Sequence, residues 1–543
     1  MIPSNLISPA GPAFKKQDML LTKPISFSMR LRSSHTSTCI LLFTAASFLY
    51  CFLFIPPFLP IEVNDAADSL LYLAPGQRMY QGEMIYRDFF EFVTPGTALV
   101  HFFLFKFFGL RPWIPNLLVI LLGLSMVWLG VVISRKLMRP SLALLPSAFF
   151  IVSVRFYLCD PTHHWYSALA AIAAIAVMLE RRTPARIAAA GILCGISACF
   201  TQTRGLAVVV GFAVFLWWES RQIQEGWRVL MKKEARLAAC FLATFLAVNA
   251  YFIWTAGLKR YLWCTVVFVL KYYPKEADWN TFQTIRTFYF PALSSLHTVL
   301  HTLDYWTFLI AVPLIFILFF LRYWRESSKR PLEYWAGPML VAIVGLFMLL
   351  CIAPSPNPNR MSVSALPALI LLGWLLDSPR KLARGFVVLF TVGAILIAAY
   401  ALVRSRPHPA GILVTPQGRV AFADPTIHEE YIWIQQHTHP SDYFYEANVS
   451  DQYFYLDLRN PTPLPRIVNN GYTTREQVAE VIRGLEQHQV RYIFWGLDKP
   501  DDLPEWENPS DARLVPLWSY MQAHYTRVMV FPDDTEIWKR VVK

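Results

Sequence analysis

The first candidate for chemistry lies in the segment "NDAADSLLY" (64–72), where Asp65 and Asp68 follow a long apolar stretch. Their spacing places both carboxylates on one face of a helix, and Tyr72 continues that face. A carboxylate in such a place can act as a general base. It can equally stabilise the positive N-terminal end of a helix. The spacing alone leaves both interpretations open.

A second group lies in "RFYLCDPTHHWY" (155–166), which combines Asp160 with the adjacent His163 and His164. One histidine near the end of an apolar segment is usually a structural hydrogen-bonding residue. Two histidines beside an aspartate can also bind a divalent cation or orient an acceptor. Asp160 and His164 are therefore candidate metal ligands and a divalent cation is a candidate cofactor, although no motif establishes one.

Basic residues stand at turns between apolar runs, with Arg204 in "CFTQTRGLAV" and Arg360 in "PSPNPNRMSVS". An arginine at this depth is costly and needs a partner. It can reach up to lipid headgroups, or its planar donor group can hold the phosphate of a lipid-linked substrate. Arg87 and Asp88, in "YRDFFE" (86–91), are either a solvated pair on a surface loop or further substrate contacts.

The elements that position these residues are apolar. The chain of 543 residues is 55% hydrophobic and only 16% charged, whereas ordinary soluble domains contain about 25% charged residues. Apolar runs of about 20 residues recur, and such a run can cross the hydrocarbon core of a membrane. The net charge of +12 lies in short clusters between these runs, a pattern typical of cytoplasmic loops rather than of nucleic-acid binding.

We expect an α-helical polytopic membrane protein with about 11 transmembrane helices. The N-terminus is cytoplasmic and the C-terminus extracytoplasmic, because this orientation puts the basic clusters inside. The run 97–109 is short and contains Lys106, so we expect it to lie in the outer interface. The predicted spans are 38–60, 114–134, 140–158, 164–180, 187–202, 204–218, 237–256, 305–321, 335–353, 361–376 and 385–403.

The organisation has three parts. Residues 1–37 are predicted to be a basic, disordered cytoplasmic segment, and 38–403 the transmembrane part, with interfacial helices in the first outer loop (61–113). Residues 404–543 carry charge throughout and alternate helical with strand-like segments, which predicts a small extracytoplasmic α/β domain. A capping box of Thr473 and Glu476 is predicted to open one helix of this domain.

The stretch "GEMIYRDFFEFVTPGT" (82–97) resembles a segment of the GT-C membrane glycosyltransferases that use polyprenyl-phosphate sugars. The closest likeness is to bacterial protein mannosyltransferases and aminoarabinose transferases. Members carry an acidic pair after the first span and then a segment of the type G-x-x-x-Y-R-D-F-F. Counting back from Gly82, the first acidic position falls on Asp68, and the second is occupied by Ser69. Asp65 is the alternative if the register differs.

Weaker likenesses run through 38–403. "PTHHWYSALAAIAA" resembles the second outer loop of the family, and "PNPNRMSVSALPALI" resembles the arginine-containing segment of a late span. In "AGILCGISACFTQTRG", Thr201 stands where the family often has a lysine, and Arg204 can take its place. The resemblance therefore implies that 38–403 is a GT-C-like catalytic domain.

The resemblance implies an inverting transfer of a sugar from a polyprenyl-phosphate donor to a lipid, glycan or protein acceptor, in cell-envelope synthesis at the bacterial inner membrane. Asp68, Asp65 and Asp160 are the candidate catalytic residues. The candidate substrate-binding residues are Arg87, Asp88, His163, His164, Arg204 and Arg360. Membrane lipids are expected partners and nucleic acid is not. Two other functions stay open, a transporter or flippase of lipid-linked sugars and a non-catalytic envelope-assembly protein.

Overall fold

The protein is described here from a computed structural model. The described residues are 28–56, 58–62, 67–154, 161–290, 299, 302–303, 305–377, 381–404, 409–447, 452–497 and 513–541. The chain divides into two compact units, Met1–Phe43 and Thr44–Lys543. In the first unit, the described residues form the beginning of helix α1 (Ser28–Phe54). All further elements belong to the second unit.

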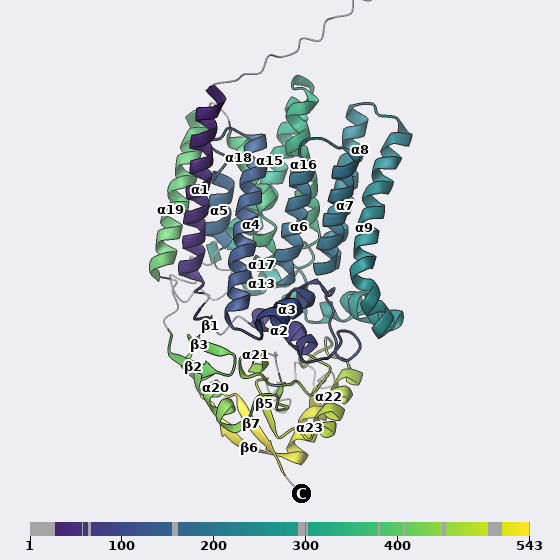
Figure 1. The fold of residues 1–543 in the computed structure, drawn as a ribbon, viewed down its shortest axis with the longest axis vertical. Coiled ribbons are helices and arrows are strands. Elements are labelled where there is room, and N and C mark those ends of the chain that lie inside the picture. Colours follow the sequence, from purple (N-terminus) through teal and green to yellow (C-terminus); the bar gives the residue numbers. More distant parts are fainter. Residues whose placement is uncertain are drawn as a thin grey trace, which may run out of the picture. The chain divides into compact units, whose positions relative to one another are not determined.

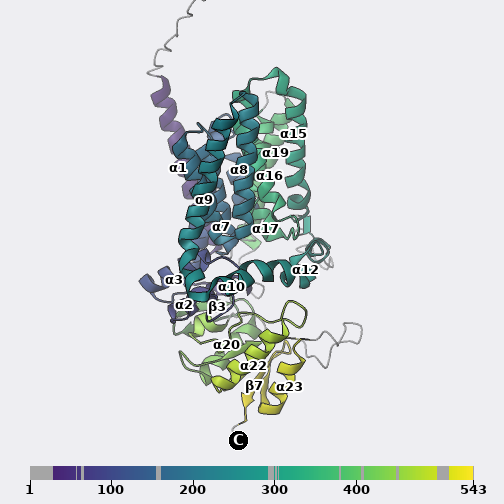
Figure 2. The ribbon, with the colours of Figure 1, turned by 90° about the vertical axis from the view of Figure 1, so that its right-hand side faces the viewer.

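Long apolar helices run side by side and form the larger part of the second unit (Figures 1 and 2). Their packing is tight at glycines: a Cβ at Gly205 of α8 would lie 2.4 Å or less from backbone atoms of Ala198 in α7. The helices of this bundle are α4 (Trp113–Leu137), α5 (Leu145–Ser153), α6 (His163–Met178), α7 (Pro184–Phe200), α8 (Gln202–Gln222), α9 (Trp227–Ala256), α15 (Val312–Glu326), α16 (Leu332–Leu350), α17 (Pro358–Val363), α18 (Leu366–Leu376) and α19 (Lys381–Arg404).

Within the described residues, four helical segments are long and apolar enough to cross a membrane: Trp113–Leu137, Trp227–Ala256, Thr307–Lys329 and Leu332–Leu350. Shorter apolar helices occupy other predicted spans, so the predicted helical membrane protein is confirmed in its broad form. The number of eleven crossings stays a prediction.

The predicted span 361–376 is built from two helices, α17 and α18, rather than one. The break falls at Ser364 and Ala365, directly before a helix with Pro367 in its first turn. Proline has no backbone N–H, so Pro367 cannot donate the hydrogen bond to the Val363 carbonyl that would continue α17. The interruption leaves the Ser364 hydroxyl inside the bundle, where it is 1% exposed.

The first outer loop forms two helices at one end of the bundle, α2 (Ala67–Tyr80) and α3 (Gly96–Phe108). Figure 1 shows them between the bundle and the C-terminal region. The two helices approach closely because Gly76 has no side chain: a Cβ there would lie 2.5 Å from the Cβ of His101. Helix α3 coincides with the run predicted to be interfacial.

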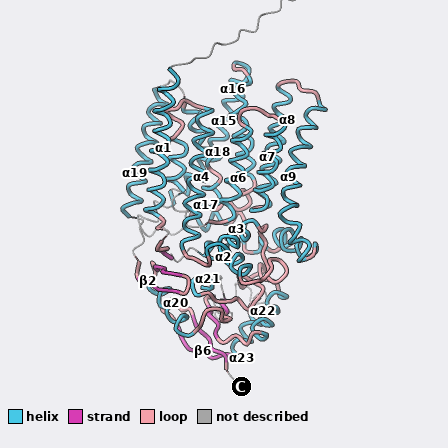
Figure 3. Tube along the Cα trace, viewed as in Figure 1, coloured by secondary structure: helices cyan, strands magenta, loops and turns pink. Residues whose placement is uncertain are grey.

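The C-terminal region contains two small sheets, which gather the strands of the molecule in one place (Figure 3). In the first, the order β1-β3-β2 pairs β1 (Ile61–Glu62) of the outer loop in parallel with β3 (Gly418–Phe422), and β3 antiparallel with β2 (Gly411–Thr415). The second has the order β4-β5-β7-β6, from Tyr445–Ala447, Tyr492–Trp495, Glu536–Arg540 and Tyr525–Val530. Only its β4–β5 pair is parallel.

Four helices accompany these strands: α20 (Pro425–His437), α21 (Gln452–Leu456), α22 (Arg475–Gln487) and α23 (Val515–His524). The capping box of α22 is formed by Thr474 and Gln477, so the predicted pair Thr473 and Glu476 is wrong by one residue. The Thr473 hydroxyl instead accepts a hydrogen bond from the backbone N–H of Val468 at 2.9 Å, which ties the preceding loop together.

One hydrophobic core joins the first outer loop to the C-terminal region. It contains Tyr86 and Phe89 of the outer loop and Trp495 of β5, all of them buried. It also contains Tyr261 of the short helix α10 (Leu258–Leu262) and Phe268 of the π-helical turn η2 (Trp263–Phe268), which follow α9. Because apolar burial is the main favourable contribution to folding, this core holds the three segments together at the end of the bundle.

Candidate functional site

The "YRDFFE" segment makes a tight loop that turns its aromatic side chains and Glu91 inward. Gly82 has a φ of 100° and Tyr86 a φ of 67°, a left-handed conformation that is uncommon for a bulky residue. The surroundings hold Tyr86 there: its hydroxyl donates to the Val93 carbonyl at 2.7 Å, and its ring is fully buried. The strained turn therefore fixes the direction of the residues that follow.

Arg87 and Asp88 lie on the outer side of this loop. The Arg87 guanidinium donates to both carboxylate oxygens of Asp88, at 2.8 and 2.7 Å. Asp88 also accepts from the Met84 backbone N–H at 2.7 Å, and the hydrogen bond from Arg87 lowers the pKa of Asp88. Asp88 lines an open polar cleft together with Arg78 of α2. Arg459 and other residues of the C-terminal region form the rest of the cleft.

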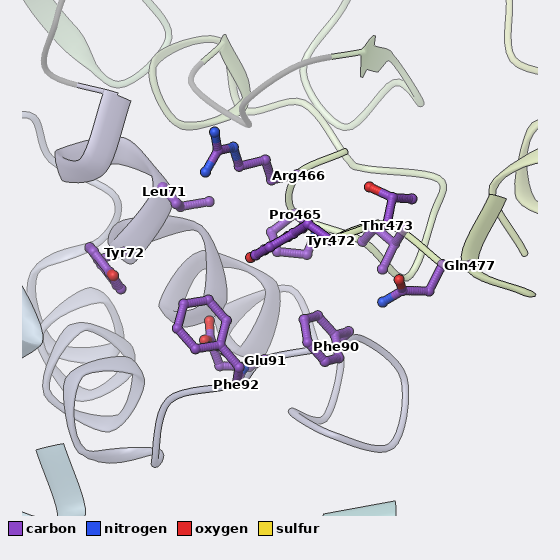
Figure 4. A pocket seen from close by; sticks show the side chains of 11 residues that line it. Leu71, Tyr72, Phe90, Glu91, Phe92, Pro465, Arg466, Tyr472, Thr473 and Gln477 are labelled. Carbon is purple, nitrogen blue, oxygen red and sulfur yellow. The ribbon is translucent and has the colours of Figure 1, made fainter. Parts of the chain in front are cut away.

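Glu91 faces a narrow pocket between α2 and the C-terminal region (Figure 4). Its side chain is 7% exposed, and one carboxylate oxygen accepts from the backbone N–H groups of Phe92 and Val93, at 2.9 and 3.0 Å. Burial raises the pKa of Glu91 from its ordinary value to about 7. A carboxyl group with such a pKa can hold or release a proton near neutral pH. The other lining residues are Leu71, Tyr72, Phe90, Phe92, Leu464, Pro465, Arg466, Tyr472, Thr473 and Gln477.

The wall contributed by the C-terminal region is anchored at two points. The Phe90 backbone N–H donates to the Pro463 carbonyl at 2.7 Å. Arg466 donates to both carboxylate oxygens of Glu276, at 2.7 and 3.3 Å, and so joins the wall to the loop after α9. Since Glu276 is buried, this pair fixes the wall more firmly than an exposed ion pair would.

A buried polar network begins on the other side of Tyr72 and crosses the end of the bundle. The Tyr72 hydroxyl lies 3.1 Å from Nε2 of His163, and Nδ1 of His163 lies 2.8 Å from the Thr201 hydroxyl. Thr201 in turn lies 3.0 Å from the Ser167 hydroxyl. The tautomer with the proton on Nδ1 satisfies every contact: Tyr72 donates to His163, His163 to Thr201, and Thr201 to Ser167.

Arg204 ends this network and is only 1% exposed. Its guanidinium donates to the His164 carbonyl and the Ser167 hydroxyl, both at 2.7 Å, and more weakly to the Ser364 hydroxyl at 3.4 Å. In the part of the chain that the structure describes, these hydrogen-bond acceptors are uncharged and the Nε atom has no partner. A buried guanidinium of this kind is a candidate site for a negatively charged group.

Arg360 lies on α17, at the same end of the bundle as Arg204. Its guanidinium donates to the Tyr273 hydroxyl at 2.6 Å and to the Ser355 carbonyl at 3.3 Å. Tyr273 packs against Phe92 with ring centroids 5.2 Å apart. This contact links Arg360 with the segment that carries Glu91.

The structure thus brings some predicted residues together and leaves others apart. His163, His164 and Arg204 share one network, whereas Arg87 and Asp88 bond to each other. Asp68 is the second residue of α2, one turn before Tyr72. Asp65 and Asp160 lie outside the described residues. No group of three His, Cys, Asp or Glu side chains suited to a metal occurs among the residues described, so the predicted cation stays a prediction.

Sequence reasoning missed two residues of this site. Glu91 was noted only as part of "YRDFFE", and Tyr72 only as a continuation of the Asp68 face. The signal for Glu91 was weak, because its burial depends on a wall supplied by residues 464–477. Thr201 was noted for replacing a lysine, and the structure shows it instead as the middle of the network.

No family model and no curated protein matches the chain in sequence. Solved structures match it in fold. ArnT from Cupriavidus metallidurans bound to undecaprenyl phosphate is 13% identical, with a TM-score of 0.53 over 93% of this chain and 99% of that one. Its apo form is 14% identical, with a TM-score of 0.51 over 93% and 98%.

The archaeal oligosaccharyltransferase AglB from Archaeoglobus fulgidus, in complex with an inhibitory peptide and a dolichol-phosphate, is 11% identical. Its TM-score is 0.51 over 92% of this chain and 74% of that one. At these identities the likeness concerns the fold. The resemblance to GT-C lipid-phosphate-sugar glycosyltransferases is therefore confirmed for the fold of nearly the whole chain.

Proposed function

We propose that this membrane protein is a glycosyltransferase that moves a sugar from a polyprenyl-phosphate donor to an extracytoplasmic acceptor. The observation that carries the proposal is the buried guanidinium of Arg204. Its hydrogen-bond acceptors among the described residues are uncharged. It lies at the end of the bundle where α2 and the C-terminal region meet. The relatives in fold include one bound to undecaprenyl phosphate and one bound to a dolichol-phosphate, which supports a donor of this class.

In the proposed reaction, an acceptor hydroxyl attacks the anomeric carbon of the sugar as the bond from that carbon to the phosphate oxygen breaks. The polyprenyl phosphate leaves with the electron pair of that bond, and the acceptor proton passes to the carboxylate of Asp68. A fixed positive charge at the developing phosphate anion stabilises the transition state. Arg204 supplies that charge, and Arg360 is the second candidate for it.

Glu91 joins the site as a second carboxyl group. Its pocket combines the Glu91 carboxyl group and the Arg466 guanidinium with several aromatic side chains, a lining typical of small-ligand sites. We place Glu91 at the edge of the sugar site rather than around it, because the cavity beside it has room for only about one or two water molecules. His163 and His164 then lie between it and Arg204 and orient the reactants, and Asp160 is the candidate to orient the acceptor.

The test uses the full chain in lipid nanodiscs with a panel of labelled polyprenyl-phosphate sugars and crude envelope acceptors. Asp68→Asn keeps the size of the side chain and removes the base, so we expect transfer to fall about 10²- to 10⁴-fold. Asp65→Asn is the matched control and should retain most of the transfer.

If Asp65→Asn abolishes transfer while Asp68→Asn retains it, the base has been assigned to the wrong aspartate. If no sugar of the panel is transferred in a manner sensitive to either substitution, the glycosyltransferase proposal fails. In sealed proteoliposomes, movement of the intact donor across the membrane without transfer would identify a flippase.

A further inference from the structure

Helix α2 is held at one residue from two sides. The Tyr72 hydroxyl lies 3.1 Å from Nε2 of His163 on α6, and the two rings pack with centroids 4.9 Å apart. On the other side, Nδ1 of His101 on α3 lies 3.2 Å from the Tyr72 carbonyl. Both histidines are buried, with exposures of 6% and 0%.

The second contact depends on local features of α2 and α3. Gly76 of α2 allows the close approach of His101, because any Cβ there would lie 2.5 Å from that of His101. The geometry therefore brings His101 within reach of the Tyr72 carbonyl.

The contact between Tyr72 and His163 connects α2 to helices α6 and α8 of the bundle. From Tyr72 the hydrogen bonds continue through His163, Thr201 and Ser167 to Arg204 without a gap, and each distance is between 2.7 and 3.1 Å. Apart from Tyr72 these side chains are buried. Buried hydrogen bonds of this kind resist exchange with water and fix the side chains that make them.

We propose that Tyr72 is a positioning residue, clamped by His163 and His101, that sets the first turn of α2 and hence Asp68 relative to Arg204. This inference rests on the proposed function, in which Asp68 and Arg204 act on the same donor. Asp68 precedes Tyr72 by four residues, so its backbone lies one turn before Tyr72 in the same helix. A shift of Tyr72 therefore moves Asp68, the proposed base, as well.

The experiment compares wild type with Tyr72→Phe, which removes the hydroxyl and keeps the ring. The matched control is Tyr80→Phe in the last turn of the same helix. For Tyr72→Phe we expect kcat to fall about 10- to 100-fold, since a displacement near 1 Å can have such an effect. The KM for the polyprenyl-phosphate sugar should remain within about twofold of wild type, and Tyr80→Phe should match wild type in both.

A second measurement needs no substrate. Hydrogen exchange of the amides at 67–74 should be faster in Tyr72→Phe than in wild type, and unchanged in Tyr80→Phe. If Tyr72→Phe does not fold, His163→Asn replaces it. Asparagine keeps a polar group near Thr201 but lacks the Nε2 atom that faces the Tyr72 hydroxyl, so faster exchange at 67–74 is again expected.

Wild-type kcat together with wild-type exchange in Tyr72→Phe overturns the inference. A raised KM with unchanged kcat also overturns it, because that pattern identifies Tyr72 as a direct sugar contact. Asp68→Asn, assayed in parallel, separates the two proposals. If it transfers normally, the proposed base is wrong, whereas an inactive Asp68→Asn beside a fully active Tyr72→Phe rejects only the clamp.

Discussion

The ionisation of Glu91 makes a prediction that can be tested before any substrate is known. The side chain is buried, and its pKa in the folded protein is raised to about 7 from an ordinary value of 4.5. The folded state therefore holds the proton more tightly than the unfolded state. Stability from this group is fully present below pH 4.5 and is lost as the pH rises through 7. Glu91→Gln, which is neutral at every pH, should lack this loss.

The magnitude follows from the two pKa values. One pKa unit corresponds to about 1.4 kcal/mol. Between pH 5 and pH 8 the wild type should lose about 2.5 kcal/mol of unfolding free energy relative to Glu91→Gln, by proton linkage. In a protein of this size such a difference corresponds to about 2 °C in Tm.

The assay is thermal unfolding of the purified protein in one detergent at a constant scan rate, from pH 5 to pH 8. The measured quantity is the Tm of Glu91→Gln minus that of wild type, which should grow steadily with pH. Glu429→Gln, at an exposed position of α20, is the control and should give a difference independent of pH.

A constant difference between Glu91→Gln and wild type over this range would refute the reasoning, because it would mean that Glu91 ionises alike in the folded and unfolded states. A difference that shrinks as the pH rises would show that the pKa is lowered, and that the pocket stabilises the carboxylate.

Two further substitutions test the phosphate site and the packing of α2. Arg204→Ala should reduce transfer about 10²- to 10³-fold by removing the charge that faces the leaving phosphate. Arg204→Lys, which keeps a positive charge, should retain part of the transfer activity. Full transfer by Arg204→Ala would exclude Arg204 from the site. Gly76→Ala should lower the free energy of unfolding by about 1–3 kcal/mol, since the added Cβ meets His101 at 2.5 Å. Gly226→Ala, where nothing lies within 4 Å, is its control, and equal denaturation midpoints for the two variants would contradict the clash.

Patterns that are local in sequence predicted the elements well. The alternation of helical and strand-like segments predicted for 404–543, and the interfacial run that forms α3, follow from short-range hydrophobic periodicity. The errors were local too. The cap of α22 shifted by one residue because Thr473 and Thr474 both offer a hydroxyl, and only the tertiary position of Val468 decides which one caps the helix.

The candidate site was only partly predictable. Arg204 was singled out because an arginine between two apolar runs is rare, and the structure finds it buried. The partners that surround it could not be predicted, because Ser167 and Ser364 are ordinary polar residues until the break between α17 and α18 brings them together.

The sequence by itself determined that this protein lies in a membrane. Long apolar runs require a bilayer, and the "GEMIYRDFF" stretch carried a resemblance to GT-C membrane glycosyltransferases that holds for the fold. Only the tertiary structure decided which side chains share a site. Glu91 gains its raised pKa from a wall more than 370 residues further along the chain, and Tyr72 meets His163 across 91 residues. Burial and hydrogen bonding between such distant segments depend on packing, which no local pattern records.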